Sequence, residues 1–428
     1  MRQEAYFCTV KELDELGKNN IPQQLISHTH LIYSSPATLA FNSPGAEGFG
    51  VKRAGLAVPD SIMLIVSPGC CGRNTSVLSS MRAYHDRFYY LLMDETDIVT
   101  GRHLKKIPKA VAEICEGLEK KPSVVMICIT CVDALLGTDM ERVCHKAEES
   151  VGIPVRPCYM YALTREGRKP PMVHVRQSIY SLLEPKKKKG NVVNLLGYFS
   201  PLIDDCELYE LLRGAGVKTI HEISRCRDYA EYQTMAEANF NLVLHPEARF
   251  AAEDFHDRLK IPYIELRRLY QTDKIASQYR AFGAALGVEF DDEAPRKAAE
   301  DAITKFRELH PDVSFAVGEW MNADPFELAL ALVRYGFRVP EIYGTLSGEN
   351  FVYVKQLAKI SPETKVFSNL EPTMLYYDGS QSDIDLTIGK DAGYYHKECP
   401  NVRWNEEQQP FGYAGVRRLF EALAEVSY

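Results

Sequence analysis

The chain has 428 residues, of which 46% are apolar and 25% are charged, so its composition is that of a globular protein and excludes a disordered or fibrous chain. Its 50 basic and 58 acidic side chains give a net charge of −8, which makes it a poor general binder of nucleic acid or anionic lipid. The charged N-terminal segment and the lack of a long apolar run predict a cytoplasmic protein without a signal peptide or a membrane span.

Short apolar runs alternate with amphipathic stretches along the whole chain. Strands are expected at residues 61–67, 88–93, 123–130, 151–158, 191–197, 217–223, 239–245, 261–266, 313–318, 365–369 and 384–389. Helices are expected at residues 102–120, 207–214, 247–259, 298–309, 325–335 and 415–426. Strands separated by such helices predict an α/β fold of doubly wound parallel sheets with helices on both faces.

Two seams divide the chain into three predicted domains. The basic run Lys186–Lys189, followed by Gly190, is interpreted as a solvated linker before a new strand. The second seam is expected at Asp291–Arg296, as an acidic, proline-containing turn between two helices. The predicted domains are residues 1–190, 191–292 and 293–428, and the last helix is expected to fold back on an earlier domain.

The motifs of several enzyme classes are missing. The sequence has no Gly-x-x-x-x-Gly-Lys-Ser/Thr phosphate loop, no Gly-x-Gly-x-x-Gly after a first strand and no Gly-x-Ser-x-Gly. It therefore indicates neither a nucleotide hydrolase, a simple NAD enzyme nor an α/β-hydrolase.

The cysteines are more informative. Eleven of them are scattered along the chain, which in a reduced compartment favours free thiols, metal ligands or catalysis over a disulfide framework. Cys70 and Cys71 follow the first predicted strand, and Cys131 follows the third, whereas Cys128 should pack inward within that strand. In open α/β sheets, ligands bind at the carboxyl ends of the strands. Cys158, at another strand end, is a secondary candidate.

Two interpretations of these thiols stay open. A buried free cysteine is usually an inert, small apolar side chain. Zinc is less natural here, because no paired Cys-x-x-Cys with matching histidines is present. An iron–sulfur cluster needs only thiolates and can draw them from separate loops or from two subunits.

Several segments, in their order along the chain, carry a family resemblance. SPGCCGRNTS contains Cys71 in a turn, PSVVMICITCVDALLGTDMERV contains Cys131 after a strand, and FAVGEWMNADPFELALALVRYGFRV opens the last predicted domain. In these segments the chain resembles the catalytic component of nitrogenase and its relatives. The relatives include dark-operative protochlorophyllide reductase, the reductase of the methanogen nickel-tetrapyrrole pathway and methylthio-alkane reductase. This nitrogenase component 1-like resemblance covers nearly the whole length and implies three Rossmann-like domains around a central cleft.

The resemblance implies an iron–sulfur cluster between two subunits. Cys71 and Cys131 take the places of ligand cysteines, and Cys70 is an alternative to Cys71. Asn42 stands where the family usually has a third cysteine, with Ser43 and Glu47 nearby as the only other oxygen ligands. A single [4Fe–4S] cluster, with two thiolates from each subunit, is therefore expected in preference to an eight-iron P-cluster or a variant of it.

The second metal site of the family is not matched. The middle-domain position falls at or beside His245, whose alternative role is that of a strand-end histidine bonded to the backbone. The C-terminal position falls near Val402–Trp404, where there is no histidine. Glu319 follows the first strand of the last domain and is expected to line the cleft. His245 and Glu319 are thus the candidates for catalytic residues.

The function that the resemblance implies is reduction. A separate ATP-hydrolysing iron protein would pass electrons to the cluster, and these would reach a substrate in the cleft, where a second metallocluster or a tetrapyrrole could also bind. The partner subunit is expected to be another component 1-like chain or a copy of this one. Two alternatives stay open: a scaffold for metallocluster assembly, and a non-enzymatic protein that binds a metal or a tetrapyrrole.

Overall fold

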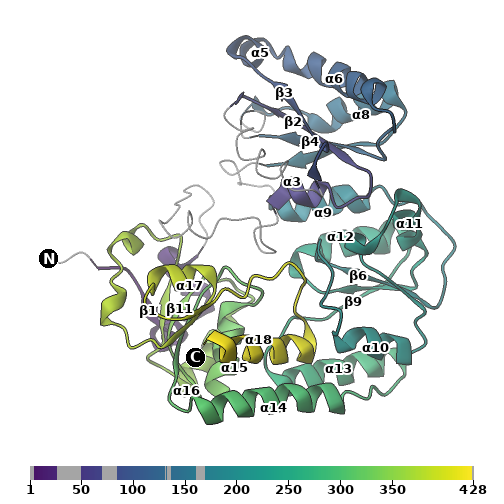
Figure 1. The fold of residues 1–428 in the computed structure, drawn as a ribbon. Helices are drawn as coiled ribbons and strands as arrows, with labels where there is room; N and C mark the ends of the chain where they lie inside the picture. The colour runs from purple at the N-terminus through teal and green to yellow at the C-terminus, as the bar shows by residue number, and fades with distance from the viewer. Residues whose placement is uncertain are drawn as a thin grey trace. The chain divides into compact units, whose positions relative to one another are not determined.

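The computed structural model describes residues 4–26, 50–69, 84–130, 132, 136–160 and 169–426. Within these ranges the chain forms two compact units (Figure 1): unit 1 comprises residues 4–26, 202–216 and 267–426, and unit 2 comprises the rest. The predicted cluster residues Asn42, Cys70, Cys71 and Cys131 lie outside the described residues.

Unit 2 contains two parallel four-stranded sheets. The N-terminal sheet has the order β3-β2-β4-β5, and its strands are β2 (Ile62–Ser67), β3 (Phe88–Leu92), β4 (Val125–Ile129) and β5 (Val155–Tyr159). The middle sheet has the order β7-β6-β8-β9, and its strands are β6 (Val192–Leu196), β7 (Thr219–His221), β8 (Phe240–Val243) and β9 (Tyr263–Glu265).

Helices cover both faces of the N-terminal sheet. They are α3 (Gly50–Gly55), α5 (Glu95–Thr100), α6 (His103–Gly117), α8 (Met140–Val151) and α9 (Pro171–Tyr180). Every residue of β2 is buried, because alternate side chains pack against opposite layers: Leu64 lies in a core with Val111 of α6, and Ile65 lies in a core with Ile179 of α9. The segments that connect the strands of the middle sheet contain α11 (Tyr229–Gln233), α12 (Arg249–Asp254) and short single-turn helices.

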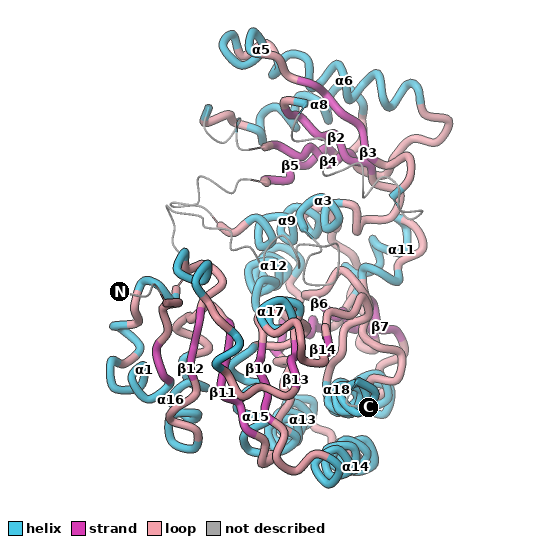
Figure 2. Tube along the Cα trace, turned by 60° about the vertical axis from the view of Figure 1, so that its left-hand side comes forward, coloured by secondary structure: helices cyan, strands magenta, loops and turns pink. Residues whose placement is uncertain are grey.

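Unit 1 is built on the six-stranded C-terminal sheet, whose order is β1-β12-β11-β10-β13-β14 (Figure 2). Its strands are β1 (Cys8–Thr9), β10 (Ser314–Val317), β11 (Arg338–Tyr343), β12 (Lys365–Phe367), β13 (Leu386–Ile388) and β14 (Asn401–Val402). All are parallel except β1, which pairs antiparallel with β12. Its helices are α1 (Val10–Leu16), α10 (Glu207–Gly214), α13 (Thr272–Leu286), α14 (Glu293–Leu309), α15 (Pro325–Arg334), α16 (Phe351–Ile360), α17 (Lys390–Tyr395) and α18 (Gly412–Val426).

The last helix is fixed by a buried carboxylate. Glu207, the first residue of α10, accepts the backbone N–H groups of Tyr413 and Ala414 at the start of α18, together with the hydroxyl of Tyr279. The carboxylate thus occupies the positive end of that helix. Gly412 has φ +62°, and a Cβ there would lie 1.9 Å from Glu207 Oε1, so the contact requires glycine. The predicted return of the last helix onto an earlier segment is confirmed.

The α/β fold class is confirmed, and each of the eleven predicted strands overlaps an observed one. The predicted turn at Asp291–Arg296 differs, because α14 already begins at Glu293. The segment predicted as a middle domain is shared between the units: the middle sheet belongs to unit 2, and α10 and α13 belong to unit 1. The boundaries at residues 190 and 292 stay a prediction.

Candidate functional site

Each of the three sheets reverses its strand order at one place. In the N-terminal sheet β3 lies on one side of β2 and β4 on the other; β7 and β8 flank β6 in the same way, and β11 and β13 flank β10. We call the pairs β2/β4, β6/β8 and β10/β13 the N-terminal, middle and C-terminal reversals. At such a place the connections leave in opposite directions, which opens a crevice outside the carboxyl ends of the two strands, where open α/β sheets bind their ligands.

The N-terminal reversal is the place to which the sequence assigns the cluster cysteines. Val66 and Ile129 are partners in the β2/β4 ladder, so the two strands end at the same edge. Cys70 and Cys71 follow β2 in the sequence, and Cys131 follows β4 directly after Thr130. Two thiol-bearing segments that leave adjacent strands suit a cluster held by thiolates. Within the described part of the chain, no three or more His, Cys, Asp or Glu side chains are arranged to hold a metal ion.

The described thiols of this sheet are packing residues. Cys128 and Cys158 are partners in the β4/β5 ladder, both are fully buried, and both belong to the core beneath α3 and α9. Burial raises the pKa of the Cys158 thiol well above its ordinary value. A Cβ at Gly55 would lie 2.8 Å from its sulfur, so α3 packs directly on it. The inward packing predicted for Cys128 is confirmed, and the surroundings of Cys158 favour the packing role over the predicted ligand role.

His245 lies at the middle reversal, just after β8. Its Nδ1 accepts the backbone N–H of Glu247 at 3.3 Å, and its ring meets that of Tyr198 edge-on at 5.7 Å. A neutral imidazole that accepts at Nδ1 carries its proton on Nε2, so a metal could bind Nε2 only after this arrangement is lost. The geometry therefore favours the backbone-bonded interpretation of His245.

A buried arginine completes the middle reversal. Arg176 of α9 donates twice to the carbonyl of Gly197, at 3.0 and 2.6 Å, and once to Glu247 Oε2 at 2.7 Å. Gly197 has φ +132°, and a Cβ there would lie 2.7 Å from the backbone nitrogen of His245. This close approach of the chain after β6 to the chain after β8 requires glycine.

The C-terminal reversal holds a pair of carboxyl groups. Asp391, fully buried after β13, accepts the backbone N–H groups of Glu319 at 2.8 Å and Trp320 at 3.2 Å, and the side-chain amide of Asn369 at 2.7 Å. Glu319, half-buried after β10, accepts the backbone N–H of Thr345 on Oε1 at 3.0 Å. Residues that follow β10, β11, β12 and β13 thus meet at one edge.

The two carboxyl groups have different surroundings. Burial raises the pKa of Glu319 to about 7, and the negative charge of Asp391 adds to the rise while the hydrogen bond from Thr345 opposes it. Burial also raises the pKa of Asp391, but the N–H donors of Glu319 and Trp320 and the Asn369 amide favour its charged form. The three N–H donors to Asp391 therefore favour the charge there, and Glu319 is the member of the pair whose pKa of about 7 lets it hold a proton near neutrality.

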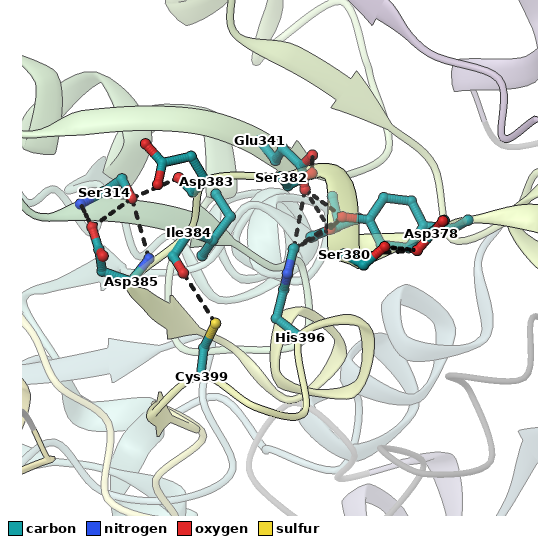
Figure 3. A network of polar contacts seen from close by, with 12 residues as sticks. Ser314, Glu341, Asp378, Ser380, Ser382, Asp383, Ile384, Asp385, His396 and Cys399 are labelled. Carbon is teal, nitrogen blue, oxygen red and sulfur yellow. Dashed lines mark hydrogen bonds and ion pairs between the residues drawn. The ribbon is translucent and has the colours of Figure 1, made fainter.

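A second polar network lies inside the C-terminal sheet (Figure 3). Glu341 of β11 is buried, and its Oε2 accepts the hydroxyls of Tyr343 at 2.8 Å and Tyr377 at 2.6 Å, while Nε2 of the buried His396 lies 3.1 Å away. Ser382 donates to Oε1 at 2.5 Å. Burial acts to raise the pKa of Glu341, but these hydrogen bonds outweigh it and hold the pKa at about 2. This buried carboxylate, with hydrogen bonds to both oxygens, joins β11 to the chain after β12 and to the residue that follows α17.

Several of these residues were not predicted from the sequence. Asn369 is the last residue of the predicted strand 365–369, and Asp391 stands two residues after the predicted strand 384–389; these positions were the available signal. Arg176 and Glu341 carried none, because partners such as Gly197 for Arg176 and His396 for Glu341 are distant in the chain. Near the C-terminal position that lacks a histidine, around Val402–Trp404, Trp404 is buried and donates its indole N–H to the Tyr270 hydroxyl at 2.6 Å.

The chain is similar to proteins of one family. The sequence profile of the Nitrogenase component 1 type Oxidoreductase family matches residues 47–427, and the chain belongs to that family. A solved structure, "Nitrogenase Cp1 at pH 6.5", superposes with a TM-score of 0.71 at 17% identity, covering 97% of this chain and 96% of that one, which shows the shared fold.

Curated relatives carry the name nitrogenase iron-molybdenum cofactor biosynthesis protein NifE. Those of Mesorhizobium japonicum and Sinorhizobium fredii are 25% and 22% identical and cover 92% and 91% of this chain and 82% of their own lengths. The protein from Nostoc is 26% identical over 238 residues, which are 54% of this chain and 49% of that protein, so the chain spans about half of it. Over the described residues, no helix combines the length and apolar character that crossing a bilayer requires.

Proposed function

We propose that the chain is the cluster-carrying subunit of a nitrogenase component 1-like reductase. Cys71 and Cys131, from each of two subunits, would hold a [4Fe–4S] cluster, with Cys70 as the alternative to Cys71. The observation that carries this proposal is the N-terminal reversal, because both cysteine segments leave strands that are direct neighbours in one sheet. When bound, such a cluster accepts and passes on single electrons.

The protein's own part is to bind the cluster, exclude water from it and position the substrate. Electrons would come from a separate ATP-hydrolysing iron protein, which agrees with the absence of a phosphate loop from the sequence. The second subunit would be another component 1-like chain or a copy of this one. Asn42, in the place of a third cysteine, supports a four-iron cluster in preference to a P-cluster-like variant.

A second candidate function is assembly of a metallocluster for another protein. The relatives that cover more than nine-tenths of this chain are named cofactor biosynthesis proteins, and this observation favours the scaffold. The bond from the Glu247 backbone N–H to His245 and the lack of a histidine near Val402–Trp404 also weaken the idea of a permanently anchored second cluster. A tetrapyrrole or a transient metallocluster remains compatible with both functions.

Anaerobic reconstitution with an ATP-hydrolysing iron protein separates these functions. For the reductase we expect an electron paramagnetic resonance signal of a reduced [4Fe–4S] cluster, and formation of dihydrogen from protons that requires both the iron protein and ATP. The chain alone should hydrolyse no ATP. Transfer of iron and sulfide to an acceptor protein without such turnover would identify the scaffold, and an iron-free protein would identify a non-enzymatic binder.

A further inference from the structure

We propose that Glu319 is the proton donor for a substrate that binds at the C-terminal reversal. The inference rests on the proposed reductase function, in which each electron delivered to a substrate must be matched by a proton. The site for it is defined by topology: Glu319 leaves β10 and Asp391 leaves β13, so the two carboxyl groups stand on opposite sides of the strand-order reversal of the C-terminal sheet.

The contacts of Glu319 hold its carboxyl group in one place. Its Oε1 accepts the backbone N–H of Thr345, and hydrogen bonds from the side chains of Thr345 and Asn369 oppose the rise of its pKa that burial causes. Glu319 is half-buried, which keeps it within reach of a ligand, whereas Asp391 is fully buried and is committed to the N–H groups of Glu319 and Trp320 and to Asn369. Asp391 is thus a positioning residue that holds the loop after β10, and Glu319 is the group that faces a substrate.

The charges around Glu319 suit an acid that works near neutrality. Of the described neighbours that act on its pKa, Asp391 on α17 is charged. Thr345 after β11 and Asn369 after β12 contribute hydrogen-bond donors that do not titrate. An acid whose pKa of about 7 lies near the working pH is half-protonated there and can both give and regain its proton.

Each electron that reaches the substrate is matched by one proton from Glu319. The O–H bond of Glu319 breaks, and a new bond forms between that hydrogen and the substrate atom that receives the electron. The electron comes from the low-potential iron–sulfur reductant, which is oxidised by one electron, and Glu319 is left as a carboxylate. Water reprotonates it before the next electron arrives, so a two-electron reduction uses the residue twice.

Glu327 offers a matched control. It is another buried glutamate of unit 1 with a pKa of about 7 that burial raises, but it lies in the first turn of α15 and accepts the backbone N–H of Tyr270 and the amide of Gln271. The E327Q substitution removes the same kind of carboxyl group, but at a position that does not follow β10. E319Q and E327Q therefore differ in position but not in chemistry.

The test uses the full-length protein and two readouts. In an infrared titration between about pH 6 and pH 8, E319Q should remove one component of the carboxyl absorption that titrates near 7, and this readout needs no turnover. In dihydrogen formation with the iron protein and ATP, E319Q should lower the rate about 100-fold and abolish the inflection near pH 7. E327Q should keep that inflection.

Two results would overturn the proposal. The first is an E319Q protein that keeps the rate and the pH profile of the wild type, because another group then supplies the proton. The second is a wild-type protein that forms no dihydrogen at any pH, which removes the reductase function and the donor role together. Dihydrogen formation by the wild type tells these cases apart, and the infrared titration reports the protonation of Glu319 in both.

Discussion

The N-terminal and C-terminal reversals share one topology and differ in chemistry. At β2/β4 the sequence supplies thiols, Cys70–Cys71 on one side and Cys131 on the other. At β10/β13 it supplies the carboxyl groups of Glu319 and Asp391. Strand order decides where a ligand can bind, whereas the few residues after each strand decide which ligand that is: in our proposals, iron and sulfide at the first reversal and a proton-accepting molecule at the second.

The largest structural effect is expected for Gly318→Ala, at the C-terminal reversal. A Cβ at Gly318 would lie 2.1 Å from Asp391 Oδ1, so the carboxylate must leave the N–H groups of Glu319 and Trp320. Overpacking and lost charge-assisted hydrogen bonds should together lower the free energy of unfolding by about 3 kcal/mol, measured by urea denaturation.

Gly214→Ala is the matched control in the same unit. Gly214 ends α10, and nothing lies within 4 Å of a Cβ placed there, so alanine should stabilise the protein by up to about 1 kcal/mol. Equal effects of the two substitutions would show that Asp391 does not organise the C-terminal reversal.

The stability of the protein should depend on pH through its buried carboxyl groups. Glu327 has its pKa raised by burial from 4.5 to about 7, so its contribution to stability is fully present below its unfolded pKa and is lost as pH rises through 7. As the pH rises from about 5 to about 8, the ionisation of this one group should lower the free energy of unfolding by about 2 kcal/mol. E327Q should flatten that part of the curve, whereas an unchanged slope would contradict the assigned protonation.

Unit 2 should respond in the opposite direction. Asp97 of α5 is bonded to Lys106 and Arg102, which lower its pKa far below the ordinary value, so its contribution is lost only as pH falls through the acidic range. Acid should therefore remove the contribution of Asp97 in unit 2, together with that of Glu341 in unit 1, whereas mild alkali should remove that of Glu327.

Much of the fold was predictable from the sequence, and the strands that were missed show where a sequence pattern fails. Buried parallel strands such as β2 are continuous apolar runs, which stand out in a sequence. β11 was missed because Pro340 interrupts it; the strand tolerates the proline because its register with β10 shifts between Ser314 and Ala316. β1 and β14 have only two residues each, too few for a pattern.

The candidate site residues were chosen from the sequence because each follows a predicted strand. The strand order puts Glu319 at the C-terminal reversal and His245 at the middle one, and it makes β2 and β4, which precede the cysteine segments, neighbours in one sheet; the roles of these residues stay a prediction. Contacts such as Arg176 with Gly197, or Glu341 with His396, depend on tertiary packing between distant residues, which no local pattern encodes.

The central claim is that the N-terminal reversal holds an iron–sulfur cluster, and the iron and sulfide content of anaerobically purified protein tests it most directly. We predict that the wild type binds about four irons per pair of subunits and that Cys71→Ser and Cys131→Ser each lose them, because serine is a hard and much less acidic ligand. Cys158→Ser and Cys115→Ser, at buried packing positions, should keep the iron and lose only modest stability. Full iron content in the Cys71 and Cys131 variants, or its loss in the Cys158 and Cys115 variants instead, would contradict the account.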